Sequence, residues 1–202
     1  QLNEFSFIHF IIPIFTTMKI RRVGPIEYNF IRFSMLVNIW WIGCKIYNNP
    51  FTAFKTVRKL IQRFTQMMGK KKLVRAFKID GKYNWDMFNP AYPSQGFNAF
   101  FRSHLLEENP SNKESSSLRR LIVAITKRCP LQCEHCSEAA TLYKKDVLSY
   151  DEIVKKIDPF VDAGVGQLVL SGGEPLSRFD DLIKILKRYQ SKCDQWVYTS
   201  AY

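Results

Sequence analysis

The sequence lacks a run of apolar residues long enough to span a bilayer. Its first apolar stretch, residues 5–15, is interrupted by His9 and Pro13 and has no basic start, which is not the pattern of a secretory signal peptide. The second stretch, residues 33–44, is also short and lies between basic residues. We therefore expect neither a signal peptide nor a transmembrane helix.

Cysteine is scarce, with five residues in the chain, and three of them, Cys129, Cys133 and Cys136, lie within eight positions. Close neighbours on a tight loop cannot all find well-shaped disulfide partners, so this set makes a poor disulfide framework. We therefore expect reduced thiols and a cytoplasmic protein. The other two, Cys44 and Cys193, are expected to pack as small hydrophobic residues.

Acidic residues are scarce as well: 18 Asp and Glu stand against 30 Lys and Arg, and the net charge is +12. The excess is concentrated in residues 1–117, with 17 basic and 7 acidic side chains, whereas residues 118–202 have 13 and 11. A basic region can contact anionic lipid, nucleic acid or an acidic partner, or it can form a solvated face. We favour the solvated face and expect no nucleic-acid partner.

Within the basic region, the pattern after Asn49 predicts an amphipathic helix. Asn49 suits the cap position, Pro50 the first helical position and Gly69 the end. Apolar residues then recur at the helical period, and basic residues occupy the other faces. The apolar positions are Phe51, Phe54, Val57, Ile61, Phe64 and Met68. Residues 50–72 could therefore make a peripheral membrane contact, although such a helix more often packs on its own domain.

Two further signals complete the first half of the chain. Residues 76–85 alternate around Asp80-Gly81, a dipeptide typical of a tight hairpin turn. Residues 107–117 contain no apolar side chain and predict a linker. The predicted organisation is a mainly helical basic region with a β-hairpin (1–106), a linker (107–117) and a second domain (118–202).

The second domain begins with the pattern of alternating strands and helices. Residues 118–126 and 165–171 are apolar runs typical of buried strands, and Trp196 to Ser200 opens a third strand. Strands that alternate with helices through short connections predict an α/β fold with a parallel βαβαβ sheet.

The two helices of this unit have their own start and stop signals. Ser149 and Glu152 form a capping box, and Gly164 ends the first helix. Ser177 is expected to cap the second. The predicted core-facing residues are Ile153, Ile157, Phe160 and Val161 in the first helix, and Phe179, Leu182, Ile183, Leu186 and Tyr189 in the second.

Two unusual loops follow the first two strands: the three-cysteine loop, and Gly172-Gly173-Glu174-Pro175. In parallel sheets, ligands bind beyond the carboxyl ends of the strands. We therefore expect these loops to face one another across a shared pocket.

The best chemical interpretation of the three cysteines is a metal site with an open coordination position. A closed zinc site needs a fourth ligand: His135 sits between two of the cysteines, and His104 and Cys193 are distant in sequence. Zinc sites typically have paired Cys or Cys-His clusters, and there is no second pair here. The spacing also differs from the four-cysteine ferredoxin run. Three thiolates with an open position suit a four-iron cluster that binds something else.

CxxxCxxC after the first strand (Cys129, Cys133, Cys136), with Gly172-Gly173-Glu174-Pro175 after the second, resembles the radical S-adenosylmethionine (radical SAM) superfamily. The resemblance implies that the three cysteines hold a 4Fe-4S cluster, whose fourth iron chelates the amino and carboxylate groups of S-adenosylmethionine. It also implies reductive cleavage of the sulfonium carbon–sulfur bond and hydrogen abstraction by the resulting 5′-deoxyadenosyl radical.

The resemblance also implies roles for the neighbouring residues. His135 precedes the last cysteine, where the family usually has an aromatic residue or His near the adenine. The Gly172 to Pro175 turn is expected beside the methionine end of the cosubstrate, where close backbone or Glu174 could meet its ammonium group. The sequence of the cysteine loop, TKRCPLQCEHC, and the segment with a hairpin that precedes it resemble the peptide- and protein-modifying, SPASM-like branch of this family.

One competing motif is set aside. LSGGE at 170–174 is similar to the signature turn of ABC transporter ATPases, but the chain has no GxxxxGK[ST] phosphate loop, so nucleotide hydrolysis is unsupported. Arg178 and Asp181, near the start of the second helix, are expected to serve solvent contacts and the helix dipole.

The resemblance implies that residues 118–202 are a truncated portion of a partial TIM-type barrel. The expected function is that of a radical SAM enzyme or its N-terminal fragment, with a flavodoxin- or ferredoxin-like electron donor. The substrate is left open, and a peptide or protein is one candidate. The alternative is a noncatalytic metal-binding or interaction module, an inactive remnant of such an enzyme.

Overall fold

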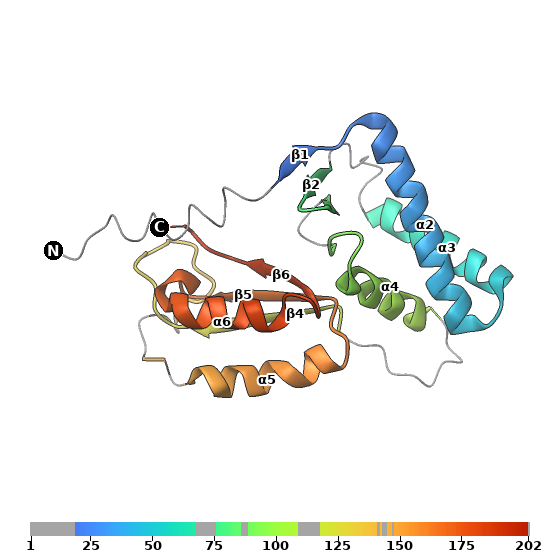
Figure 1. Ribbon diagram of the computed structural model, residues 1–202. Coiled ribbons are helices and arrows are strands. Elements are labelled where there is room, and N and C mark those ends of the chain that lie inside the picture. The colour runs from blue at the N-terminus through green and yellow to red at the C-terminus, as the bar shows by residue number, and fades with distance from the viewer. Residues whose placement is uncertain are drawn as a thin grey trace.

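The computed structural model describes residues 19–67, 76–85, 89–108, 118–140, 142, 145–146 and 148–201. The first half of the chain is mainly helical, as the sequence predicts, with helices α2 (Pro25–Tyr47), α3 (Pro50–Met67) and α4 (Gln95–Glu107). Figure 1 shows these helices on one side of the molecule and a parallel sheet with its two helices on the other.

The predicted start of α3 is confirmed. Oδ1 of Asn49 accepts hydrogen bonds from the backbone nitrogens of Phe51 (2.9 Å) and Thr52 (3.1 Å), which otherwise have no partner in the first turn. Met68 and Gly69, expected at the other end, lie outside the described residues. Helix α4, which was not predicted, begins at a cap in which Ser94 Oγ accepts from the nitrogen of Phe97 at 2.9 Å.

The predicted hairpin is also confirmed, and it belongs to a three-stranded antiparallel sheet. Strands β2 (Phe77–Ile79) and β3 (Lys82–Asn84) flank Asp80 (φ 46°) and Gly81 (φ 85°), whose positive angles fit a type I′ turn. The short strand β1 (Ile20–Arg22), absent from the prediction, pairs with β2. This small sheet packs beside α2 through Val23, Ile31 and Ala76.

The helices enclose a core of buried apolar side chains: Ile39, Val57, Leu60, Phe97, Phe100, Phe101 and Leu105. Glu107, the first residue of the predicted linker, is instead the last residue of α4. Glu108 follows it and forms ion pairs with Lys59 (2.8 Å) and Arg63 of α3. Residues 109–117, the rest of the predicted linker, lie outside the described residues.

The second half has the predicted βαβαβ order. Strands β4 (Arg120–Thr126), β5 (Gln167–Gly172) and β6 (Asp194–Val197) pair in parallel in the order β4-β5-β6. Helices α5 (Tyr150–Asp162) and α6 (Phe179–Tyr189) connect them and bury one face of the sheet, around Leu168 and Leu170 of β5. Within the described residues this sheet is open and does not close into a barrel.

The capping box that begins α5 is confirmed, since Ser149 Oγ accepts from the nitrogen of Glu152 (3.3 Å) and the Glu152 carboxylate accepts from the nitrogen of Ser149 (2.8 Å). One core position was wrong: Phe160 is 40% exposed, and Val154 is buried in its place. Gly164 follows the helix with φ 85°.

Two predictions around α6 and β6 were wrong in detail. Ser177 does not cap α6; it lies within a short 3₁₀ helix, η1 (Pro175–Arg178), which leads directly into α6. Ile185 is fully buried, whereas the predicted core residue Ile183 is only half-buried. Strand β6 begins at Asp194 and ends at Val197, so Thr199 and Ser200 lie beyond the strand.

Helix α4 packs against the amino ends of β5 and β6. A Cβ atom at Gly96 would lie 2.4 Å from the carbonyl oxygen of Gly166 and 2.7 Å from the nitrogen of Asp194, so glycine is needed for this approach. The helical half and the parallel sheet are thus in direct backbone contact. No helix of the described part combines the length and the hydropathy required to cross a membrane.

Candidate functional site

The two loops that the sequence singles out are hydrogen-bonded to one another at the carboxyl ends of β4 and β5. The nitrogen of Gly173 donates to the carbonyl of Thr126 at 2.8 Å, and the nitrogen of Glu174 donates to the carbonyl of Arg128 at 2.7 Å. These two bonds continue the pairing of β5 with β4 into the residues directly before Cys129. The expectation that the loops meet at one sheet edge is confirmed.

Both glycines of the turn are required by the closeness of this contact. Gly172 has φ 135°, and a Cβ there would lie 2.4 Å from the carbonyl oxygen of Thr126. A Cβ at Gly173 would lie 2.2 Å from the carbonyl oxygen of Arg128 and 3.2 Å from the Cβ of Cys129. Only glycine therefore allows the turn to lie directly against the backbone that enters the cysteine loop.

The three cysteines are free thiols that differ in exposure: Cys133 is exposed, and Cys129 and Cys136 are half-buried. The nitrogen of Cys136 donates to the carbonyl of Cys133 at 3.3 Å, which places these two residues on one turn. His135 lies on the same turn and is exposed. Among the described residues, no group of three or more His, Cys, Asp or Glu side chains is placed so that it could hold a metal ion.

Asp146 ties the far end of the cysteine loop back to the end of β4. Its carboxylate accepts from Thr126 Oγ1 at 3.0 and 3.1 Å and from the nitrogen of Lys127 at 2.7 Å. It also pairs with Arg128 Nε at 3.2 Å. The described parts of the loop therefore start and finish at the same point, beside the glycine turn. Sequence reasoning missed Asp146, because nothing local marks its distant partners.

The carboxylate of Glu174 is occupied by its own chain. Oε1 accepts from Thr199 Oγ1 (2.6 Å) and the nitrogen of Leu176 (3.0 Å), and Oε2 accepts from the nitrogen (2.9 Å) and Oγ (2.7 Å) of Ser200. The residue is 3% exposed. Burial alone would raise the pKa of this carboxyl, but the hydrogen bonds from Thr199, Ser200 and Leu176 outweigh it and lower the pKa.

This arrangement changes the meaning of the predicted Glu174 contact. The side chain fixes the residues after β6 to the glycine turn, so Glu174 joins all three strand ends of the sheet. Contact of this turn with a ligand stays a prediction, and the backbone of Gly172 and Gly173 is the part of it that remains half-exposed. Pro175 is buried as the first residue of η1.

A pocket of about 260 Å³ lies next to the glycine turn. It is lined by the ends of β4 and β5, by Gly173, and by side chains from the loop after the cysteines, including Glu138, Leu142 and Asp146. None of the cysteines lines it. A pocket is thus present at the glycine turn, but the expectation that it lies between this turn and the three cysteines is not confirmed.

Arg178 lines the same pocket and is more than a solvent contact. Its Nε donates to Asp181 at 2.7 Å, and its Nη1 donates to the carbonyl of Ile125 at 3.0 Å. Arg178 therefore joins η1 to the end of β4. Cys193 lies far from this pocket in the core, where burial raises the pKa of its thiol to about 11, as expected for a packing residue.

Comparison with known proteins gives one family for this part of the chain. The family model of the radical SAM superfamily matches residues 123–198. A GTP 3′,8-cyclase of Mesorhizobium japonicum is 38% identical over 85 residues, which are 40% of this chain and 25% of that protein. A PqqA peptide cyclase of Bradyrhizobium diazoefficiens is 36% identical over 85 residues, 41% of this chain and 22% of that protein.

A GTP 3′,8-cyclase of Sulfurovum sp. is 32% identical over 87 residues, which cover 41% of this chain and 27% of that protein. The chain thus spans about a quarter of the length of the curated relatives it matches. No solved structure matches it.

Proposed function

Since residues 123–198 match the radical SAM superfamily, we propose that this chain is the N-terminal part of a radical SAM enzyme, with its cofactor site at the carboxyl ends of β4 and β5. The observation that supports this most strongly is the direct backbone bonding between the glycine turn and the residues that precede Cys129. Two motifs separated by one βα unit in sequence are thereby brought to one place.

In this proposal Cys129, Cys133 and Cys136 hold a 4Fe-4S cluster, and the donor set fits it: three free thiols on a loop with a close-packed base. Because the thiols are not yet gathered around one point, binding requires the loop to draw them together. When bound, the cluster supplies an electron and S-adenosylmethionine supplies the radical that abstracts hydrogen from a substrate.

The residues around the cysteines position and shield this site. Asp146 holds the far end of the loop at the strand end, and Gly173 keeps the turn against the backbone of Arg128, directly before Cys129. His135, exposed beside Cys136, is available to contact the adenine of S-adenosylmethionine. The half-exposed backbone of Gly172 and Gly173 is available to contact its methionine end. Glu174, through its hydrogen bond from Thr199, and Pro175, as the buried first residue of η1, fix the position of the turn.

Peptide or protein modification is the substrate class that we propose. It is supported by the similarity to a PqqA peptide cyclase, although similarity to GTP 3′,8-cyclases is equally strong in this region. The proposal includes a flavodoxin- or ferredoxin-like electron donor and a cytoplasmic location, which suits five free cysteines.

A second candidate is a noncatalytic metal-binding or interaction module. The observation that favours it is that, among the described residues, the three thiols do not form a group placed to hold a metal ion. In that case the cysteines would only hold the loop together and would not support cleavage of S-adenosylmethionine.

Anaerobic reconstitution with iron and sulfide separates the two. We expect iron and acid-labile sulfide in near-equal amounts, retained in Cys44→Ala and lost when Cys129, Cys133 and Cys136 are all replaced by Ala. Cys44 is the matched control because it is a half-buried free thiol outside the loop. Tightly held zinc without sulfide, or iron that survives the triple replacement, contradicts the proposal.

A further inference from the structure

Helix α2 exposes a continuous apolar stripe to solvent. Ile26 (88% exposed), Phe30 (72%), Phe33 (65%), Val37 (44%) and Trp41 (56%) recur at spacings of three and four and therefore share one side of the helix. The opposite side is already buried against the helical core. Single exposed apolar residues are ordinary, but a stripe about 22 Å long, from the rise of a helix, needs a partner.

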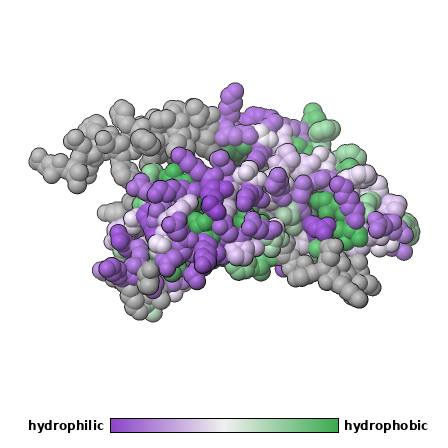
Figure 2. Space-filling model, turned by 60° about the horizontal axis from the view of Figure 1, so that its bottom comes forward, coloured by the Kyte–Doolittle hydropathy of each residue, from purple (hydrophilic) through white to green (hydrophobic). Residues whose placement is uncertain are grey.

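Helix α3 extends this surface. Phe51 (65% exposed) and Phe54 (58%) project from α3, and an apolar groove of about 500 Å³ lies between the two helices. The groove is lined by Leu36, Val37, Trp40, Phe54, Val57, Arg58, Ile61 and Gln62. Figure 2 shows hydrophobic side chains gathered among hydrophilic ones over this helical part of the molecule. We call the set Phe30, Phe33, Val37, Trp41, Phe51 and Phe54 the α2–α3 face.

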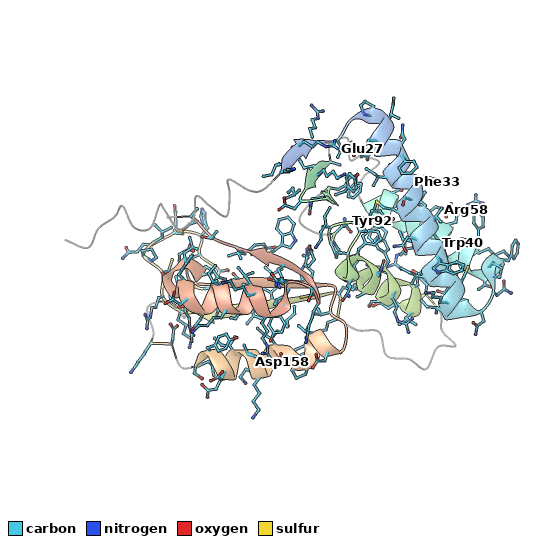
Figure 3. All side chains as sticks on the ribbon, in the orientation of Figure 1. Glu27, Phe33, Trp40, Arg58, Tyr92 and Asp158 are labelled. Carbon is cyan, nitrogen blue, oxygen red and sulfur yellow. The ribbon has the colours of Figure 1, made fainter. Side chains whose placement is uncertain are left out.

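The surroundings of the α2–α3 face are basic. Residues 19–67 contain nine Lys and Arg and one acidic residue, Glu27, which is paired with Arg21; Lys59 and Arg63 are paired with Glu108. Lys55 lies 4.6 Å from the ring centre of Phe51, and Arg58 lines the groove. Neither of these two cations has an ion-pair partner among the described residues. Figure 3 shows Phe33, Trp40 and Arg58 along the same outer side of α2 and α3.

We propose that the α2–α3 face docks on an anionic membrane surface. Exposed Phe and Trp side chains enter the boundary between headgroups and acyl chains, and nearby Lys and Arg neutralise anionic headgroups. A lipid surface satisfies both features at once. A second copy of the chain would bring two sets of cations together, and an acidic peptide would leave much of the apolar stripe in water. The proposal does not depend on the cofactor site.

Co-sedimentation of the full chain with vesicles tests it. We expect binding to phosphatidylcholine vesicles that contain phosphatidylglycerol, weak binding to phosphatidylcholine alone, and a decrease at high salt. The double variant Phe30→Ser/Phe33→Ser should lose about tenfold or more in affinity. Lys55→Glu/Arg58→Glu should lose about fivefold or more for each cation removed.

Matched controls come from α5, on the other half of the molecule. Phe160→Ser removes a phenylalanine that is 40% exposed, and Lys155→Glu reverses an exposed cation, and both should bind as the unaltered chain does. Circular dichroism checks that every variant is folded. Light scattering of the chain without vesicles is measured in parallel, because it shows whether a second copy of the chain covers the α2–α3 face.

Three outcomes overturn the proposal. The first is no binding of the chain to vesicles of either composition, and the second is binding that is unchanged in the Phe30→Ser/Phe33→Ser variant. The third is a dimer of the unaltered chain that becomes monomeric in this variant, with no binding to vesicles.

Discussion

Asp146 and Thr126, 20 residues apart, are joined by hydrogen bonds of 3.0 and 3.1 Å from the Thr126 hydroxyl to the Asp146 carboxylate. The bond closes the chain on itself around the three cysteines, at the point where β4 ends. The same carboxylate, on a side chain that is 12% exposed, also accepts from the nitrogen of Lys127. Asp146 therefore holds the two ends of the cysteine loop together at its base.

Replacement of Asp146 should loosen this base. Asp146→Ala leaves the Thr126 hydroxyl and the Lys127 nitrogen without their acceptor, which we expect to lower the free energy of unfolding by about 1–3 kcal/mol. Urea denaturation measures it. Asp162→Ala is the control, because Asp162 is 68% exposed and its 3.5 Å pair with Lys192 is worth little. Equal effects of the two replacements would contradict the role given to Asp146.

Gly173→Ala tests the close approach of the two loops. The new Cβ would lie 2.2 Å from the carbonyl oxygen of Arg128, so backbone must move, and we expect a loss of about 1–3 kcal/mol in the free energy of unfolding. The control is Gly24→Ser, where a Cβ has nothing within 4 Å and Ser is favoured at the cap position of α2 that Gly24 occupies, so the free energy of unfolding should not fall. If Gly173→Ala is as stable as Gly24→Ser, the loops are not in the contact described.

Glu174→Gln tests the junction between the glycine turn and the residues after β6. The amide nitrogen cannot accept from Ser200 or Thr199, so we expect a loss of about 1–3 kcal/mol at neutral pH. The native pKa of Glu174 is lower than its ordinary value of 4.5, so its stabilisation is present above that value and is lost as pH falls through the native pKa.

The difference in unfolding free energy between the unaltered chain and Glu174→Gln should therefore shrink when urea titrations are repeated at acidic pH, below about 4.5. A difference that is constant with pH would show that the ionised carboxylate is not what stabilises the junction.

His104 should make the helical half sensitive to acid. Burial, with a further contribution from Arg119, lowers its pKa to about 4, whereas an unfolded chain binds the proton near pH 6.5. The unfolded state therefore binds more protons between these values, and stability should decrease as pH falls from about 6.5 towards 4. Glu107, Glu108 and Arg63 also act on this group, with smaller effects on its pKa.

Urea midpoints at about pH 7 and about pH 5 measure this effect, which should be on the order of 1 kcal/mol. His104→Gln removes the titrating group and should show a smaller decrease between the two pH values. An identical decrease in both proteins would assign the acid sensitivity to other residues.

Local signals in the sequence were sufficient wherever a structure depends on near neighbours. Asn49 caps α3, Ser149 and Glu152 form their capping box, and Asp80-Gly81 makes its turn. Each of these is decided within about four residues of chain. The parallel order of the sheet also followed, since alternating strands and helices leave few other arrangements.

The errors concern residues whose environment is set from a distance. Helix α4 was not predicted: Gly96 disfavours a helix, yet it lies in α4, where a Cβ would clash with the backbone of Gly166. Ser177 is an exception, because its error is local: Pro175, two residues earlier, begins the 3₁₀ helix in which Ser177 lies.

The candidate site divides in the same way. The cysteine spacing, the position of the two loops after their strands and the resemblance to the radical SAM superfamily singled out Cys129, Cys133, Cys136 and the glycine turn. The partners of Glu174, however, are Thr199 and Ser200 on another strand end, and no local pattern marks such a pairing. The positioning residues of the site therefore became visible only with the fold.

The most direct test of the central claim is electron paramagnetic resonance of the anaerobically reconstituted and reduced chain, recorded with and without S-adenosylmethionine. The account predicts the signal of a reduced 4Fe-4S cluster that changes when S-adenosylmethionine is added, and no such signal when Cys133 is replaced by Ala. A cluster signal that S-adenosylmethionine leaves unchanged would contradict the account, because it would mean that the cosubstrate does not reach an open iron.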